Sequence, residues 1–285
     1  MFDFHIHIAR LPQKRQLTQL LYNGNYDFIA IACEPWEWEE VAQLKKVFST
    51  EIKPFKLTYG IHPMIATQAN DEMFAKLREY LQDEHAMVGE AGIDKRYPGY
   101  EDGTQDRVFW EQAKLALELK RDLQIHCVGD YMRVLKLLDK AGFPRDRAQG
   151  RDAQDLQVLP RMQESPRPIF HRFGGDLSVV QKSLPYGAFF SLHADSFHKK
   201  STAAAIPHIP QERIFFETDA DETFMRNYPN GESRAQTSDN NVILNNDNVI
   251  LNAVKDPAQC TPEECVAELE ARLESVRAAY AKSCE

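Results

Sequence analysis

Short apolar runs alternate with longer amphipathic stretches along most of the chain. The apolar runs are rich in Ile, Val, Phe and Ala, as is typical of strands buried on both faces of a parallel sheet. We expect eight such strands, at residues 1–8, 28–33, 55–61, 86–94, 123–128, 169–173, 188–193 and 213–219. Helical stretches lie between and after them, at residues 11–22, 36–48, 71–82, 104–121, 131–141, 177–184, near Thr202, and at 262–282.

This alternation predicts an α/β fold, a single-domain (β/α)₈ barrel (TIM barrel) over residues 1–285. An open doubly wound sheet with fewer strands would require that some of these runs are not strands. No Gly-x-Gly-x-x-Gly follows the first strand, which weakens a dinucleotide-binding fold. We interpret residues 142–168, between the fifth helix and the sixth strand, as an arginine-rich surface insertion. Residues 221–260, after the eighth strand, are expected to form a long loop, in which Asn-Val-Ile-Leu-Asn occurs twice within residues 241–252.

Composition and charge narrow the class of protein. With 43% hydrophobic and 27% charged residues, the composition is that of an ordinary globular protein. A net charge of −9 argues against nucleic-acid binding by bulk charge, although a local basic patch stays open. The five cysteines are scattered without a CxxC pair, which favours reduced thiols. No apolar run approaches about 18 residues, and no secretory leader pattern opens the chain. We therefore expect a cytoplasmic protein with no membrane association and no obligate protein partner.

Residues with metal-binding side chains lie toward the C-terminal ends of the predicted strands. Side chains at i and i+2 of a strand share a face, so His5 and His7 are expected to project together. Such a pair is a weak signal alone, but four further strands carry an imidazole or a carboxylate: Glu90, His126, His171 and Asp219. Active sites of β/α barrels form at this end of the strands. We therefore predict a metal centre in the barrel mouth.

Four imidazoles and two carboxylates exceed what one tetrahedral ion with an open position requires. They suit two divalent ions (Mg, Mn or Zn) about 3.5–4 Å apart that share a bridging carboxylate. We predict Glu90 as the bridge, His5, His7 and Asp219 around one ion, and His126 and His171 around the other, with no thiolate ligand. Such a centre activates water for hydrolysis of phosphate esters, amides or lactones. Asp219 is also expected to accept the proton of the attacking water.

Six motifs together resemble the TatD family of metal-dependent deoxyribonucleases, within the amidohydrolase-like barrels. They are Asp3-Phe4-His5-Ile6-His7, Gly60-Ile61-His62-Pro63, Gly89-Glu90-Ala91-Gly92-Ile93-Asp94, Ile125-His126-Cys127, His171-Arg172-Phe173-Gly174-Gly175 and Glu217-Thr218-Asp219. The resemblance implies a (β/α)₈ barrel with two divalent ions and phosphodiester hydrolysis on DNA, and ligand roles for the same six residues. It also implies that His62 contacts the phosphate and that Asp94 supports the ligands from behind.

The chain departs from the family pattern around the substrate cleft. Asp221 and Glu222 follow Asp219-Ala220 where the family usually has a proline, and the Arg-Asn-Glu-Pro-like segment after the eighth strand is not recognisable. The insertion at residues 142–168 is also unusual. These departures concern the identity of the substrate, whereas the residues of the hydrolytic centre follow the family pattern.

We therefore expect a metal-dependent hydrolase of ester bonds, a deoxyribonuclease with Glu90 and Asp219 as catalytic residues. The expected substrate is DNA, as single strands or ends, or a small phosphoester, and basic residues after the strands are candidates to bind it: Lys95, Arg96, Arg172, Lys199 and Lys200. The alternatives are a hydrolase of a small ester, amide or lactone on the same barrel, and a non-catalytic binding protein, which the ligand set does not support.

Overall fold

The computed structural model describes residues 1–145, 166–223 and 261–284. Eight parallel strands pair in sequence order. They are β1 (Phe2–Ile6), β2 (Asp27–Ala32), β3 (Leu57–Tyr59), β4 (Ala86–Asp94), β5 (Leu123–Val128), β6 (Pro168–Phe170), β7 (Phe189–Leu192) and β8 (Ile214–Phe216). A parallel bridge between Ile6 and Ala220 joins the first strand to the segment after the last. The sheet is thus a nearly closed barrel, which confirms the predicted fold.

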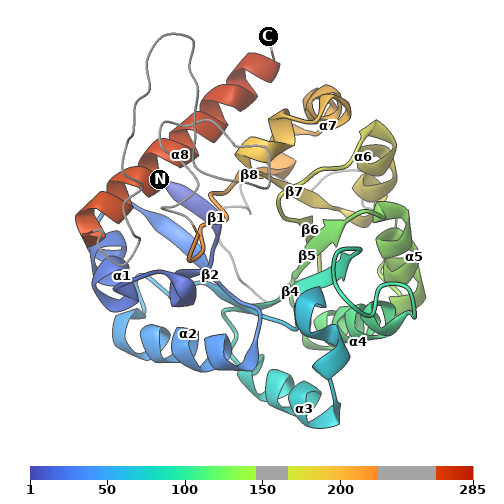
Figure 1. Ribbon diagram of the computed structural model, residues 1–285, viewed down its shortest axis with the longest axis horizontal. Helices are drawn as coiled ribbons and strands as arrows, with labels where there is room; N and C mark the ends of the chain where they lie inside the picture. The colour runs from blue at the N-terminus through green and yellow to red at the C-terminus, as the bar shows by residue number, and fades with distance from the viewer. Residues whose placement is uncertain (146–165, 224–260, 285) are drawn as a thin grey trace, which may run out of the picture.

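The helices form a ring outside the strands (Figure 1). They are α1 (Lys14–Asn23), α2 (Pro35–Phe48), α3 (Asp71–Tyr80), α4 (Thr104–Leu119), α5 (Tyr131–Ala141), α6 (Leu177–Ser183), α7 (Lys200–Ala205) and α8 (Pro262–Ser283). Several begin where a short polar side chain accepts a hydrogen bond from a free backbone N–H of the first turn, as at Asn70, Asp130 and Asp176. None of the helices in the described part of the chain is long and apolar enough to cross a membrane.

Aromatic and aliphatic side chains fill the barrel interior below the mouth. One buried cluster draws Phe4, Ile29, Met87, Ile169 and Phe189 from five strands, which can meet only inside the barrel. The Phe4 ring stacks on that of Phe215 from β8, with centroids 4.2 Å apart. This apolar plug leaves the opposite, C-terminal end of the strands for polar side chains.

The barrel is irregular at two strands. The pairing register shifts between Asp3 and Ile6 in β1, and between Val88 and Ala91 in β4. An irregularity of this kind re-aims the side chains inside it. His5 and Glu90 lie within these two segments, and both point into the mouth.

The two ends of the segment at residues 142–168, predicted as an insertion, pack against the barrel. Phe143 and Arg167 are buried, and Arg167 forms a buried ion pair with Asp122, with a separation of 2.6 Å. These flanking residues therefore belong to the barrel, because their side chains pack and pair within it. The rest of the insertion and most of the predicted loop at 221–260, including the repeat at 241–252, lie outside the described residues.

Candidate metal centre

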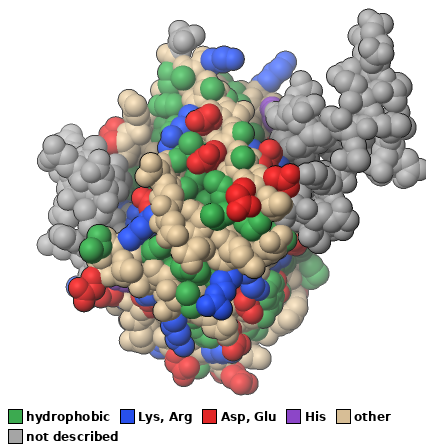
Figure 2. All heavy atoms as spheres, turned by 90° about the vertical axis from the view of Figure 1, so that its left-hand side faces the viewer, with side chains coloured by type: hydrophobic (Ala, Val, Ile, Leu, Met, Phe, Trp, Pro, Cys, Tyr) green, Lys and Arg blue, Asp and Glu red, His purple; other side chains and the backbone are tan. Residues whose placement is uncertain are grey.

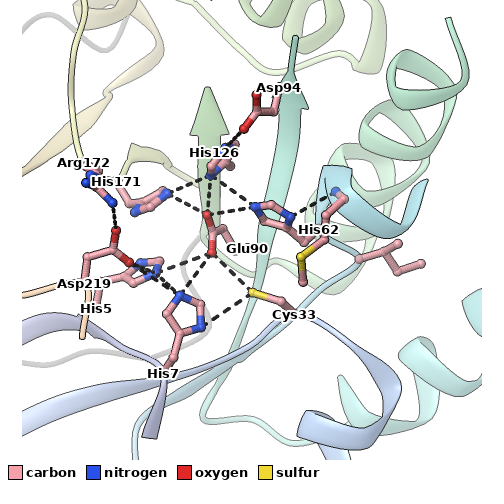
Figure 3. A network of polar contacts seen from close by, with 12 residues as sticks. His5, His7, Cys33, His62, Glu90, Asp94, His126, His171, Arg172 and Asp219 are labelled. Atoms are coloured by element: carbon pink, nitrogen blue, oxygen red, sulfur yellow. Dashed lines mark hydrogen bonds and ion pairs between the residues drawn. The ribbon is translucent and has the colours of Figure 1, made fainter. Parts of the chain in front are cut away.

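The six residues predicted as ligands meet in one cluster at the C-terminal mouth of the barrel (Figure 3). The strands are shorter than expected at two of them. His171 follows the last residue of β6, and Asp219 lies three residues beyond β8 in a left-handed conformation with φ 50°. Buried polar residues continue past the paired ones, at His171 after β6 and at Glu217 and Thr218 after β8, and the expected strands included them. The side chains of His171 and Asp219 still turn into the mouth.

Four donor atoms converge on one side of Glu90. They are His5 Nε2, His7 Nε2, Glu90 Oε2 and Asp219 Oδ1. Their five recorded separations lie between 3.2 and 3.7 Å. Neighbouring donors around a tetrahedral ion with bonds of about 2.1 Å are about 3.4 Å apart. The spacing therefore fits a single divalent ion.

A second group faces the other carboxylate oxygen of Glu90. Glu90 Oε1 lies 2.5 Å from His126 Nδ1 and 2.6 Å from His171 Nε2, and these two nitrogens are 3.1 Å apart. The shorter contacts are hydrogen bonds, in which protons on the imidazoles supply the positive charge next to the carboxylate. Metal binding at such a site releases those protons. Glu90 thus has one oxygen in each group, as a bridging ligand requires.

The charges of the two carboxylates are maintained by their neighbours. Burial alone would raise the pKa of Glu90, but the imidazoles of His171 and His126 hold it well below its ordinary value. Burial likewise opposes ionisation of Asp219, yet the Arg172 guanidinium and His7 hold its pKa well below the ordinary value. Both carboxylates are therefore ionised at neutral pH and suit a hard or borderline divalent cation.

Two further carboxylates hold the histidines from behind. Asp94 Oδ2 lies 2.9 Å from His126 Nε2, the nitrogen that points away from Glu90. Glu217 Oε1 accepts a hydrogen bond of 2.6 Å from the Arg172 backbone N–H and lies 3.4 Å from His171 Nδ1. Metal-binding histidines commonly donate their second N–H to a carboxylate in this way. Asp94 was predicted in this position, whereas Glu217 was not singled out.

Close approach of β4 and β5 depends on Gly92. A Cβ at Gly92 would lie 1.8 Å from the backbone oxygen of His126. The glycine therefore lets β5 come near enough for His126 to reach Glu90, and no larger residue fits without moving the backbone.

His62 belongs to the centre as well. Its Nδ1 accepts a hydrogen bond of 3.1 Å from the Met64 backbone N–H, and its Nε2 lies 3.6 Å from Glu90 Oε1. Burial lowers the pKa of His62 well below its ordinary value, so the ring is neutral. With Nδ1 as acceptor, Nε2 carries the proton. His62 therefore presents an N–H donor to the centre.

Arg172, predicted to bind substrate, is engaged by carboxylates of the site. Its Nη1 lies 2.6 Å from Asp219 Oδ2, and its Nη2 also pairs with Asp195. The guanidinium thus holds the Asp219 side chain in place. Its role toward a substrate stays a prediction.

Cys33, like Glu217, lies at the centre although the sequence pattern assigned it no role there. Its Sγ lies 3.3 Å from Glu90 Oε2. The available signal was its place at the end of an apolar run, at the same edge of the barrel as the other residues. The prediction expects no thiolate among the ligands and gives the thiol no other role.

The centre forms the floor of an open cavity of about 710 Å³. Lys95, Tyr97, Tyr131 and Lys199 are among its lining residues, whereas Lys200 is not. No carboxylate in the described ranges pairs with Lys95 or Lys199, and the Lys199 ammonium donates to the Gly174 backbone oxygen at 3.0 Å. Two cations are therefore available to an anionic ligand above the centre.

Comparison with known proteins gives consistent matches. The model of the family described as TatD related DNase matches residues 2–237. Relatives from Cronobacter sakazakii and Cronobacter turicensis, both named 3′-5′ ssDNA/RNA exonuclease TatD, are 28% identical over 167 residues, which cover 57% of this chain and 56% of each relative. The chain therefore matches a little over half the length of these curated relatives.

Solved structures resemble the whole barrel. A TatD homologue from Escherichia coli has a TM-score of 0.62 at 17% identity and covers 97% of both chains. A hydrolase of the TatD family from Entamoeba histolytica has a TM-score of 0.60 at 13% identity, over 99% of this chain and 96% of that one. At these identities the likeness bears on the fold.

Proposed function

We propose that this chain, which belongs to the TatD-related DNase family, is a divalent-metal-dependent hydrolase that cleaves phosphodiester bonds in nucleic acid. The observation that carries the proposal is the division of the donor atoms between the two oxygens of Glu90. It supports two ions, one with His5, His7 and Asp219, and the other with His126 and His171. Magnesium, manganese and zinc are the candidates, and the high share of imidazole favours zinc.

Bound divalent ions would stabilise the negative charge that develops on the phosphoryl and leaving-group oxygens and lower the pKa of the attacking water. Side chains of the protein accept the proton of the water and donate a hydrogen bond to the phosphate. Asp219, held by Arg172, accepts the proton of that water. The His62 Nε2–H donates a hydrogen bond to a phosphoryl oxygen, since its pKa keeps the ring neutral and its Nδ1 is already engaged.

The cavity suits the end of a strand or a single-stranded segment. Its volume of about 710 Å³ is in the range of small-molecule sites. Lys95 and Lys199 are placed to pair with phosphates adjacent to the scissile one. Figure 2 shows a side of the barrel, on which acidic and basic side chains are interspersed. We therefore propose that the substrate is a single strand or a strand end.

The direct test is hydrolysis of end-labelled oligonucleotides by protein loaded with magnesium, manganese or zinc. We expect shortening of single-stranded DNA that EDTA stops, and loss of activity in Asp219→Asn. Lys95→Ala and Lys199→Ala should weaken oligonucleotide binding and reduce its dependence on salt. Metal-loaded protein that cleaves no nucleic acid but hydrolyses a small ester, amide or lactone would overturn the nuclease proposal and support the alternative.

A further inference from the structure

Cys33 occupies a fixed position directly after β2. Its side chain is buried, and its backbone N–H donates a hydrogen bond of 2.6 Å to Glu37 Oε2. Its backbone oxygen accepts a hydrogen bond of 3.2 Å from the His62 N–H. Glu37, itself buried, also pairs with Arg10 at 2.5 Å. The thiol is therefore held in place by main-chain contacts on both sides.

The Cys33 thiol lies between two residues of the metal centre (Figure 3). Sγ is 3.3 Å from Glu90 Oε2 and 3.9 Å from His7 Nδ1. His7 Nε2 instead faces Glu90 and Asp219, at 3.7 and 3.5 Å. When His7 binds an ion through Nε2, its Nδ1 carries a proton that needs an acceptor. In the described part of the chain, Cys33 Sγ is the polar atom recorded beside that nitrogen.

A thiol can be the acceptor for His7 and the donor to Glu90 at the same time. Its sulfur is a weak acceptor and its S–H a weak donor. Sγ can accept from His7 Nδ1–H while the S–H donates to Glu90 Oε2, so one side chain orients two ligands from behind. Direct ligation fits less well, because Sγ contacts the ring nitrogen of His7 that does not face the other donors.

We propose that Cys33 is a positioning residue of the metal centre, which fixes the tautomer of His7 and the orientation of Glu90. The proposal rests on the metal centre of the proposed function. It adds a thiol to a site otherwise built from imidazoles and carboxylates. Cys33 does not touch the ions or the substrate, and it acts through the two residues that do.

The test is the affinity for manganese or zinc, measured by titration calorimetry on the metal-free full chain. Cys33→Ala should lower the affinity for the ion held by His5, His7 and Asp219 by about 10–100-fold, as is typical when a ligand loses its hydrogen-bond partner. Cys33→Ser, which keeps a donor and an acceptor, should retain the affinity within about threefold. Cys127→Ala is the matched control. Cys127 lines the same cavity but belongs to no group of candidate metal donors among the described residues.

Two spectroscopic readouts test the same proposal. In the zinc-loaded wild-type protein, nitrogen NMR of the histidines should show His7 protonated at Nδ1, and an unprotonated Nδ1 would overturn the proposal. In the cobalt-loaded protein, we expect no sulfur-to-cobalt charge-transfer band. Such a band, lost in Cys33→Ala, would make Cys33 a ligand and would also overturn the positioning role.

The measured metal affinities distinguish a failure of this proposal from a failure of the proposed function. A wild-type chain that binds no divalent ion would overturn the proposed function and this inference with it. Wild-type binding with unchanged affinity in Cys33→Ala overturns the role of Cys33 alone. Equal losses in Cys33→Ala and Cys33→Ser would show that hydrogen bonding by the thiol is not what matters.

Discussion

Asp94→Asn tests how far the proposed metal centre depends on a residue that does not touch the ions. The Asp94 carboxylate is buried, lies 2.9 Å from His126 Nε2, and receives Arg96 Nη2 at 2.6 Å. Asparagine keeps the shape but removes the charge, and its NH₂ group competes with the His126 N–H for the same space. His126 then loses the acceptor that orients its ring.

The expected cost is a 10–100-fold lower metal affinity, or about 1.4–2.7 kcal/mol. The affinity for one of the two ions should decrease. Of the six proposed ligands, Asp94 contacts His126, which lies with His171 on the Oε1 side of Glu90. The ion on the Oε2 side should bind as in the wild type, because no contact of Asp94 reaches that group in the described structure.

The assay is a two-site titration of the metal-free protein with manganese, with metal content checked after dialysis. Arg96→Gln is the matched control. It breaks the same Asp94–Arg96 contact from its exposed side and should change the affinity less than about threefold, since an exposed partner contributes little. Equal weakening of both ions by Asp94→Asn, or no weakening at all, would refute the assignment of Asp94 to His126.

Three further predictions concern stability. Gly92→Ala should destabilise the fold by about 3 kcal/mol or more, because the alanine Cβ would overlap the His126 backbone oxygen. Urea unfolding measures this loss, and a variant with near wild-type stability would contradict the prediction. Divalent ions at 100 times their Kd should add about 2.7 kcal/mol per site, and EDTA should lower Tm correspondingly; an unchanged Tm would contradict folded-state metal binding. Arg167→Ala leaves Asp122 buried without its partner and should lower the free energy of unfolding by about 3–5 kcal/mol. Arg145→Ala removes one partner of an exposed pair and should leave the urea midpoint unchanged. Equal urea midpoints in the two variants would contradict the role of burial.

The sequence predicts element bounds well where a local signal marks both ends. The structure has β4, β5 and α5 at the residues expected from the pattern. The α5 helix starts after Asp130, which accepts from the Arg133 N–H, and ends before Gly142, which adopts φ 95°. Each of these residues supplies an interaction or a conformation that its neighbours cannot, so the boundary is visible in the sequence.

Strand length is overestimated where burial continues without pairing. Residues 55–61 are expected to form a strand, but β3 covers Leu57–Tyr59. Ile61 is buried, yet its N–H donates to the Gln112 side chain at 2.7 Å rather than to a neighbouring strand. Hydrophobicity indicates burial, and it does not say which partner satisfies the backbone.

The residue types of the site follow from the sequence, but their division into two groups does not. The alternation of a regular strand places side chains on two faces and says nothing about which oxygen of Glu90 meets which histidine. That division depends on register shifts in β1 and β4 and on the left-handed backbone of Asp219, which bring distant segments into contact. Cys33 illustrates the same limit, since its contact with Glu90 joins residues 57 positions apart. A residue that orients ligands from behind has no spacing rule of its own, so it becomes visible only when the barrel closes around it.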